Sequence, residues 1–186
     1  MKQKLIPLIA LASIASMSAA THATEGGGST YPAAENYLMG AAPPPGVHVL
    51  GYATSYSSTT LKNGSGNTVA IPGFKVNANV AVARVVLSTD TQVMGGNFLA
   101  HLIAPFIDLT VMDFHKSGLG DLTVGAGVAY HHSPSLHSVV ALDVSLPTGS
   151  YDKSAMANIG HNYVSIQPTY LGVWAAEEFP LTQSCV

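Results

Sequence analysis

The stretch Asp121-Leu-Thr-Val-Gly-Ala-Gly-Val-Ala-Tyr-His131 (DLTVGAGVAYH) alternates between two kinds of side chain. One set is apolar and consists of Leu122, Val124, Ala126, Val128 and Tyr130. The other set is polar or small and consists of Asp121, Thr123, Gly125, Gly127 and Ala129. Because successive side chains of a β-strand point to opposite faces, this period of two predicts a strand with one apolar face and one polar or small face.

The same alternation recurs along the chain, in segments separated by turn-like clusters rich in Gly, Pro, Ser and Asn. The predicted strand segments are 47–56, 74–83, 106–114, 121–131, 138–146 and 162–174, and the clusters are 62–67, 117–120, 132–135 and 147–160. No segment combines a strong helical period with caps at both ends. The sequence therefore predicts an all-β fold, an antiparallel meander of long amphipathic strands. Arg84 interrupts the apolar face of one segment, where we expect either a β-bulge or the end of the apolar zone.

The N-terminus has the features of an export signal. Lys2 and Lys4 precede an apolar run that ends near Met17, and small residues follow up to a cleavage site after Ala23. The three prolines at 43–45 are expected to end a flexible leader and set the direction of the first strand. The predicted organisation is a signal peptide at 1–23, a Gly- and Pro-rich leader at 24–46, strands at 47–174 and an irregular tail at 175–186.

Composition excludes several classes of function. Only 9% of the residues are charged and seven are Lys or Arg, so there is no basic patch for nucleic acid. The single cysteine, Cys185, allows no intramolecular disulfide. No nucleophile motif such as Gly-x-Ser-x-Gly occurs, so we expect no enzyme and no catalytic residue.

Three histidines, His131, His132 and His137, lie close together in the sequence. A metal site needs ligands that converge, whereas a strand end followed by a Ser-Pro turn offers no fixed face and no nearby carboxylate. We therefore expect a polar hairpin loop and no metal site here.

Two architectures accommodate strands of this kind. In an outer-membrane β-barrel the apolar faces point outward to lipid, and in a soluble periplasmic β-sandwich they point inward to a core. Several segments reach the ~9–11 residues that a tilted strand needs to cross a bilayer, and Tyr130, Tyr170 and Trp174 lie near segment ends, as in aromatic girdles. This favours the membrane barrel, and the soluble binding module remains the alternative.

Short phrases spread over the whole mature chain also resemble one known family. They are Thr24-Glu25-Gly26-Gly27, Tyr31-Pro32-Ala33-Ala34-Glu35, Ala42-Pro43-Pro44-Pro45-Gly46, Ile71-Pro72-Gly73-Phe74, Gly118-Leu119-Gly120-Asp121-Leu122, Leu146-Pro147-Thr148-Gly149-Ser150-Tyr151, Asn158-Ile159-Gly160-His161-Asn162-Tyr163 and Gln167-Pro168. In these phrases the chain resembles the phenol-degradation meta-pathway proteins, a group of bacterial outer-membrane β-barrels.

The resemblance implies a passive, cofactor-free barrel that lets hydrophobic or aromatic compounds cross the outer membrane. Its partners would be outer-membrane lipid, the barrel-assembly machinery and those small molecules. Candidate lumen-lining residues are Asp121, Thr123, Asp143, Tyr163, Ser165 and Gln167.

Members of this family continue with further strands beyond the Gln-Pro phrase. We therefore interpret this chain as an incomplete barrel, truncated or frameshifted near residue 172. About six strands are too few to close a barrel, because the smallest have eight. We expect such a fragment not to insert alone and to remain in the periplasm, since open edges in lipid leave backbone groups unpaired.

Overall fold

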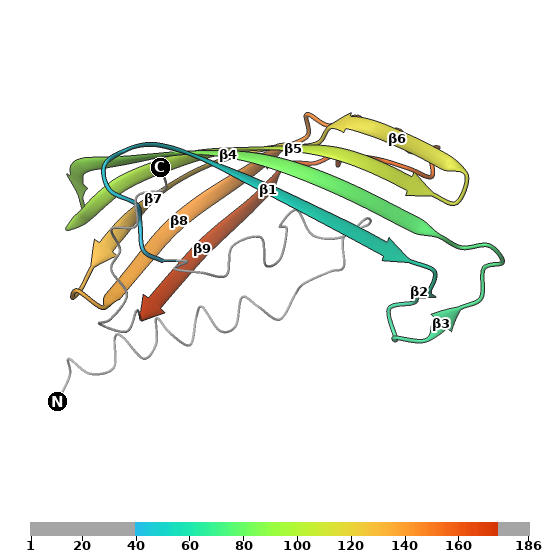
Figure 1. The fold of residues 1–186 in the computed structure, drawn as a ribbon, viewed down its shortest axis with the longest axis horizontal. Coiled ribbons are helices and arrows are strands. Elements are labelled where there is room, and N and C mark those ends of the chain that lie inside the picture. Colours follow the sequence, from blue (N-terminus) through green and yellow to red (C-terminus); the bar gives the residue numbers. More distant parts are fainter. Residues whose placement is uncertain (1–39, 175–186) are drawn as a thin grey trace. The chain divides into compact units, whose positions relative to one another are not determined.

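Antiparallel strands dominate residues 40–174, the part of the chain that the computed structural model describes (Figure 1). The predicted signal peptide, most of the leader, the tail and Cys185 lie outside these residues. The strands are β1 (Gly46–Ser58), β2 (Leu61–Lys62), β3 (Thr68–Val69), β4 (Val76–Val93), β5 (Gly96–Val111), β6 (Phe114–Leu119), β7 (Leu122–His131), β8 (Leu136–Leu146) and β9 (Ser165–Trp174). Within residues 40–174 no helix is long and apolar enough to cross a membrane.

Seven of the strands form one sheet in the order β1-β4-β5-β7-β8-β9, with β6 also paired to β5. All pairs are antiparallel, and the short strands β2 and β3 form a separate hairpin between β1 and β4. The prediction of an all-β antiparallel meander is confirmed. Among the described strands β1 pairs only with β4 and β9 only with β8, so the sheet does not close within residues 40–174.

The three prolines lie where the sequence predicts, directly before the first strand. β1 begins at Gly46, one residue after Pro45. The Ser88 hydroxyl donates to the Pro43 carbonyl at 2.9 Å, and Nε2 of His48 lies 2.8 Å from the Pro44 oxygen. These contacts hold the proline segment against the beginning of β1 and the adjoining end of β4.

The long hairpin of β4 and β5 differs from the prediction. Residues 85–105 carried no predicted strand, yet the two strands contain 18 and 16 residues. Met94 and Gly95 both have positive φ, which is the geometry of a two-residue hairpin turn that matches the twist of the strands. Both expectations for Arg84 are wrong, because the register is continuous there and Val86, two residues on, is still buried. The register shifts instead between Ser88 and Gln92.

The predicted turn at 117–120 is also wrong, because the chain continues in the same direction there. β6 and β7 both pair with β5, and together they act as one strand with a break. Leu119 is the partner of Phe106 and Thr123 the partner of Ile103, so three residues oppose two. This is a β-bulge. Pro105 lies opposite it, has no N–H to donate, and accepts a hydrogen bond from the Gly120 amide at 2.9 Å.

The register assigns every strand residue to one of two faces, because cross-strand partners share a face. We call one the Trp174 face; it carries Val49, Leu87, Leu102, Val124, Leu142, Ile166 and Trp174. We call the other the Asp143 face; it carries Val82, Arg84, Val86, His101, Gly125, Asp143 and Gln167. The small buried cluster of Leu99, Ala129 and Val139, with Ala42, Ala141 and Leu171 against it, includes residues of this second face.

Candidate functional site

A row of charged and polar side chains crosses the Asp143 face. Arg84 of β4 lies with its Nη2 atom 2.9 Å from Nδ1 of His101 on β5. Since arginine can only donate, this nitrogen of His101 accepts and Nε2 carries the proton. Nε2 lies 3.1 Å from Oδ1 of Asp143 on β8, and the two side chains are only 5% and 19% exposed. The row therefore places a cation and an anion on either side of a neutral imidazole.

Gly125 of β7 makes this contact possible. His101, Gly125 and Asp143 are successive cross-strand partners on β5, β7 and β8, so the two side chains meet above the glycine. A Cβ atom at position 125 would collide with Oδ1 of Asp143 and Nε2 of His101. The small residue that the alternation places in the middle of β7 thus provides the space for a polar bridge across it.

The row continues to β9 through a weaker contact. The Thr169 hydroxyl donates to Oδ2 of Asp143 at 3.4 Å, and Gln167 is the cross-strand partner of Asp143. One step along the sheet, the hydroxyls of Thr123 and Ser145 are 3.2 Å apart, and Ser145 is the partner of Ser165.

Four of the predicted lumen residues therefore share one face, as the sequence suggests. They are Thr123, Asp143, Ser165 and Gln167. The other two, Asp121 and Tyr163, lie outside the strands, in the bulge and in the segment before β9.

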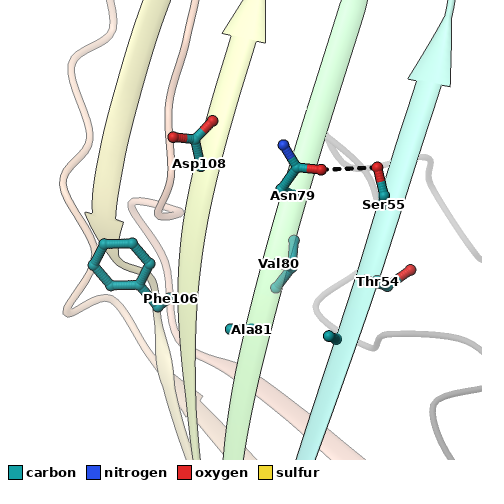
Figure 2. Close-up of a pocket in the computed structure, with 8 residues that line it drawn as sticks. Thr54, Ser55, Asn79, Val80, Ala81, Phe106 and Asp108 are labelled. Atoms are coloured by element: carbon teal, nitrogen blue, oxygen red, sulfur yellow. Dashed lines mark hydrogen bonds between the residues drawn. The ribbon is translucent and has the colours of Figure 1, made fainter.

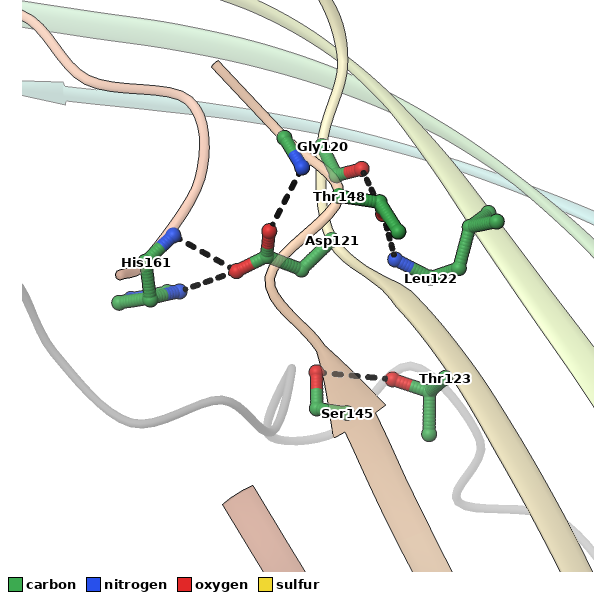
Figure 3. A network of polar contacts seen from close by, with 8 residues as sticks. Gly120, Asp121, Leu122, Thr123, Ser145, Thr148 and His161 are labelled. Carbon is green, nitrogen blue, oxygen red and sulfur yellow. Dashed lines mark hydrogen bonds and ion pairs between the residues drawn. The ribbon is translucent and has the colours of Figure 1, made fainter. Parts of the chain in front are cut away.

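Asp121 anchors the long connection between β8 and β9 (Figure 3). Its Oδ1 accepts a hydrogen bond from the Gly149 amide at 2.8 Å, and its Oδ2 accepts one from the His161 amide at 2.7 Å. Nδ1 of His161 lies 2.9 Å from the same Oδ2 and must carry the proton, because a carboxylate only accepts. The Asp121 side chain is 8% exposed, so these are buried, charge-assisted contacts. Beside them the Thr148 hydroxyl accepts from the Leu122 amide at 2.9 Å.

Two glycines bring the ends of this connection into backbone contact. A Cβ atom at Gly160 would lie 2.5 Å from the carbonyl carbon of Gly149. A larger residue at position 160 would therefore push the two backbone segments apart. Gly120, in the bulge, packs against Gly149 and Ile159. Three phrases that are far apart in the sequence, 118–122, 146–151 and 158–163, therefore meet at one point.

The middle of the same connection is held by local contacts. The Asp152 amide donates to Oδ1 of Asn158 at 2.8 Å, and Nδ2 of Asn158 donates back to the Asp152 carbonyl at 2.9 Å. Hydrogen bonds from the hydroxyl and the amide of Ser154 hold the pKa of Asp152 below its ordinary value. This carboxylate is exposed, and within residues 40–174 its hydrogen bonds stay inside its own turn, in contrast to those of Asp121.

The hollow shown in Figure 2 lies toward the β2–β3 end of the Trp174 face. It is shallow, has a volume of about 410 Å³ and is lined by Ala53, Thr54, Ser55, Asn79, Val80, Ala81, Phe106 and Asp108. It marks a boundary in surface chemistry. At its polar edge and beyond, Ser55 and Ser57 donate to the side chains of Asn79 and Asn77, each at 2.8 Å, and Asp108 lies 3.2 Å from Nε2 of His115. The apolar part of this face ends at the hollow.

The three neighbouring histidines lie at the β7–β8 hairpin, as the predicted strand end and turn indicate. His131 is the last residue of β7 and His137 lies in β8, so only His132 belongs to the turn. Its Nε2 lies 2.8 Å from the Ser138 hydroxyl, and its ring stacks on Tyr130. No group of three or more metal-ligating side chains gathers among residues 40–174.

Residues 58–183 match the model of the family described as "Putative MetA-pathway of phenol degradation". The chain belongs to this family. The match includes the three phrases that converge at Asp121 as well as Gln167-Pro168, and it extends beyond Trp174; the phrases before residue 58 lie outside it. No curated protein and no solved structure matches the chain at a significant level.

Sequence reasoning did not identify Arg84, His101 and His161 as members of these two sites. The sequence does contain a signal for the row of polar side chains on the Asp143 face. Arg84, His101 and Asp143 each have an apolar residue on both sides in the sequence, and ionisable residues need partners when buried. The partner of Asp121 could not be found this way, because forty residues of chain separate it from His161.

Replacing Asp121 should release the β8–β9 connection. Asp121→Ala leaves the amides of Gly149 and His161 without an acceptor, so we expect the free energy of unfolding to fall by about 1–3 kcal/mol. Amide hydrogen exchange at these two residues should accelerate as well. Asp152→Ala, in the same connection, is the matched control: it removes only exposed bonds within one turn and should have a much smaller effect on both. Equal effects of the two substitutions would contradict the anchoring role.

Gly125→Ala should destabilise the protein through the row alone. We expect a loss of about 1–3 kcal/mol in urea unfolding, because the added methyl group has to displace His101 or Asp143. In an Asp143→Ala background the same change should cost less, with a coupling of about 0.5–3 kcal/mol. Ala126→Val, on the opposite face, controls for a larger side chain in β7. An identical cost of Gly125→Ala in both backgrounds would show that the polar bridge is not what requires glycine.

Proposed function

We propose that β1 and β4–β9 are wall strands of an outer-membrane β-barrel and that the Asp143 face lines a passive path for hydrophobic or aromatic solutes. The observation that carries this proposal is the exposed apolar surface of the Trp174 face. Trp174 is 81% exposed, Val49 74% and Tyr170 73%, and Ile166 on the same face is 65% exposed. Isolated exposed apolar residues are ordinary, but a continuous face of them indicates contact with lipid or with another apolar surface.

The alternative, a soluble periplasmic β-sandwich, would bury such a face against a second sheet. The sheets formed by residues 40–174 are the seven-stranded one and the small hairpin of β2 and β3. The latter has only two residues in each strand, which is too little to cover the Trp174 face. The distribution of exposed apolar residues therefore supports the membrane proposal over the sandwich.

The dimensions of the strands also support the proposal. The 11 residues of β8 span about 36 Å at ~3.3 Å per residue, and tilted by about 45° they cover about 25 Å. That height equals the apolar band of outer-membrane barrels. β4 and β5 are longer, and their additional residues include those at and beyond the hollow, where polar pairs replace apolar side chains on the Trp174 face.

The connections differ in length at the two ends of the sheet. The turns at 94–95 and 132–135 are short and lie at the end that holds Gly46 and Trp174. The other end holds the long connections at 59–75 and 147–164, together with the two-residue turn at 112–113. Outer-membrane barrels have short periplasmic turns and long external loops. In the proposed orientation Asp121 and its loop anchor face the outside of the cell, and Trp174 lies at the periplasmic boundary.

The edge strands β1 and β9 need partners if the sheet lies in lipid, because unpaired backbone groups there cost several kcal/mol each. Residues outside 40–174 or another copy of the chain would have to supply them. The Asp143 face then encloses the polar row, and the solute passes beside side chains such as Asp143, Thr169 and Gln167. This role needs no catalytic group and no cofactor.

Fluorescence of Trp174 tests the membrane part of the proposal, because this is the single tryptophan of the chain. In vesicles we expect a blue-shifted emission that is quenched by brominated acyl chains, more strongly when the bromine lies near the headgroup than near the chain end. Trp174→Phe should abolish the signal. Emission typical of water, quenched by iodide and unaffected by brominated lipid, would favour the soluble sandwich.

Solute flux tests the path along the Asp143 face. The vesicles should contain lipopolysaccharide, since hydrophobic solutes cross plain phospholipid bilayers unaided, and a nitrophenol serves as a coloured probe. We expect Thr169→Trp to reduce its protein-dependent entry several-fold, because the new side chain fills the proposed lumen. Tyr170→Trp, the next residue on the opposite face, is the matched control and should leave the flux unchanged. Equal flux in both variants and the wild type would rule out this face as the path.

A further inference from the structure

A pair of histidines faces each other across the β7–β8 hairpin. His131 and His137 are cross-strand partners, and their Nδ1 atoms lie 2.8 Å apart. The two rings meet at 75° with centroids 4.9 Å apart. The hairpin therefore supplies the fixed geometry that the spacing of these residues in the sequence does not reveal.

The contact of Nε2 of His137 determines which ring nitrogen of this histidine carries the proton. Nε2 of His137 lies 3.2 Å from the carbonyl oxygen of Pro134, which can only accept, so Nε2 carries the proton. Nδ1 of His137 therefore presents a lone pair toward His131. A backbone carbonyl that orients an imidazole in this way is the usual outer contact of a metal-binding histidine. His137 is only 4% exposed, which fixes its ring, whereas His131 is open to solvent.

We propose that His131 and His137 form a two-nitrogen binding site for a divalent transition-metal ion, with Cu²⁺ preferred. At a metal–nitrogen distance of about 2.05 Å, two nitrogens 2.8 Å apart subtend about 86° at the metal. This is close to the right angle between neighbouring ligands of a square-planar or octahedral ion, and smaller than a tetrahedral angle. The geometry thus favours Cu²⁺ or Ni²⁺ over Zn²⁺.

Binding requires one proton to move. Without metal, His131 donates its Nδ1 proton to the lone pair of His137; with metal, His131 carries its proton on Nε2 and both Nδ1 atoms bind the ion. Water fills the remaining positions, because the exposed His131 leaves that side of the site open. His132 takes no part, since its ring lies against Tyr130 and its Nε2 is paired with Ser138.

The test is a Cu²⁺ titration of the full chain in detergent, followed by electron paramagnetic resonance. Cys185→Ser serves as the background, because a thiol would compete for the ion. We expect hyperfine coupling to two nitrogens, and at least a tenfold loss of affinity in His131→Ala. His131 is exposed, so this variant should fold, and unchanged circular dichroism checks that it does.

His132→Ala is the matched control, and it should bind Cu²⁺ as the background protein does. Wild-type affinity in His131→Ala, or equal losses in the two variants, would overturn the proposal. So would a site that prefers Zn²⁺ to Cu²⁺ and Ni²⁺, because that preference indicates tetrahedral coordination by other ligands.

Discussion

The missing N–H of Pro105 is the constraint on which the arrangement of both sites depends. Pro105 is fully buried in a central strand, where each residue ordinarily donates to a neighbour. The neighbouring strand accommodates it with a bulge at Gly120, whose amide donates to the Pro105 carbonyl. The bulge also takes Asp121 out of the regular strand, so its carboxylate can anchor the β8–β9 connection. Beyond it, β7 resumes its alternation and places Gly125 between His101 and Asp143.

Much of the fold could be predicted from the sequence, because alternation and turn chemistry are local. β7 is predicted almost to the residue, and the Pro-Pro-Pro segment and the turn at 132–135 lie where expected. The second half of β4 and the first half of β5 could not be predicted this way. Residues such as Val85, Val86 and Leu87 are apolar on both faces, so the period of two disappears, although one of them is buried and another is 43% exposed.

For the candidate sites, too, only what local alternation determines could be predicted from the sequence. Alternation correctly groups Thr123, Asp143, Ser165 and Gln167 on one face, because their strands are adjacent and in register. It assigns Asp121 to that face too, since a bulge has no signature in the alternation of a single strand. Contacts such as Asp121 with His161 depend on how a long connection folds back, and a spacing pattern carries no information about that.

The bulge changes which residues of the chain face which side of the sheet. Leu119 and Leu122 share the Trp174 face although three positions separate them, which a regular strand would not allow. The extra residue of the bulge shifts the alternation by one position, so that the apolar side chains of β7 point to the Trp174 face. Without Gly120, one of the two strands would have to exchange its faces. Either β7 would point its leucine and valine side chains toward the buried charges of the Asp143 face, or β6 would exchange its two faces. A change of length in the connection at 59–75 does not alter the faces of the strands. Insertions and deletions of single residues should therefore be tolerated there, whereas at the bulge they should destabilise the fold.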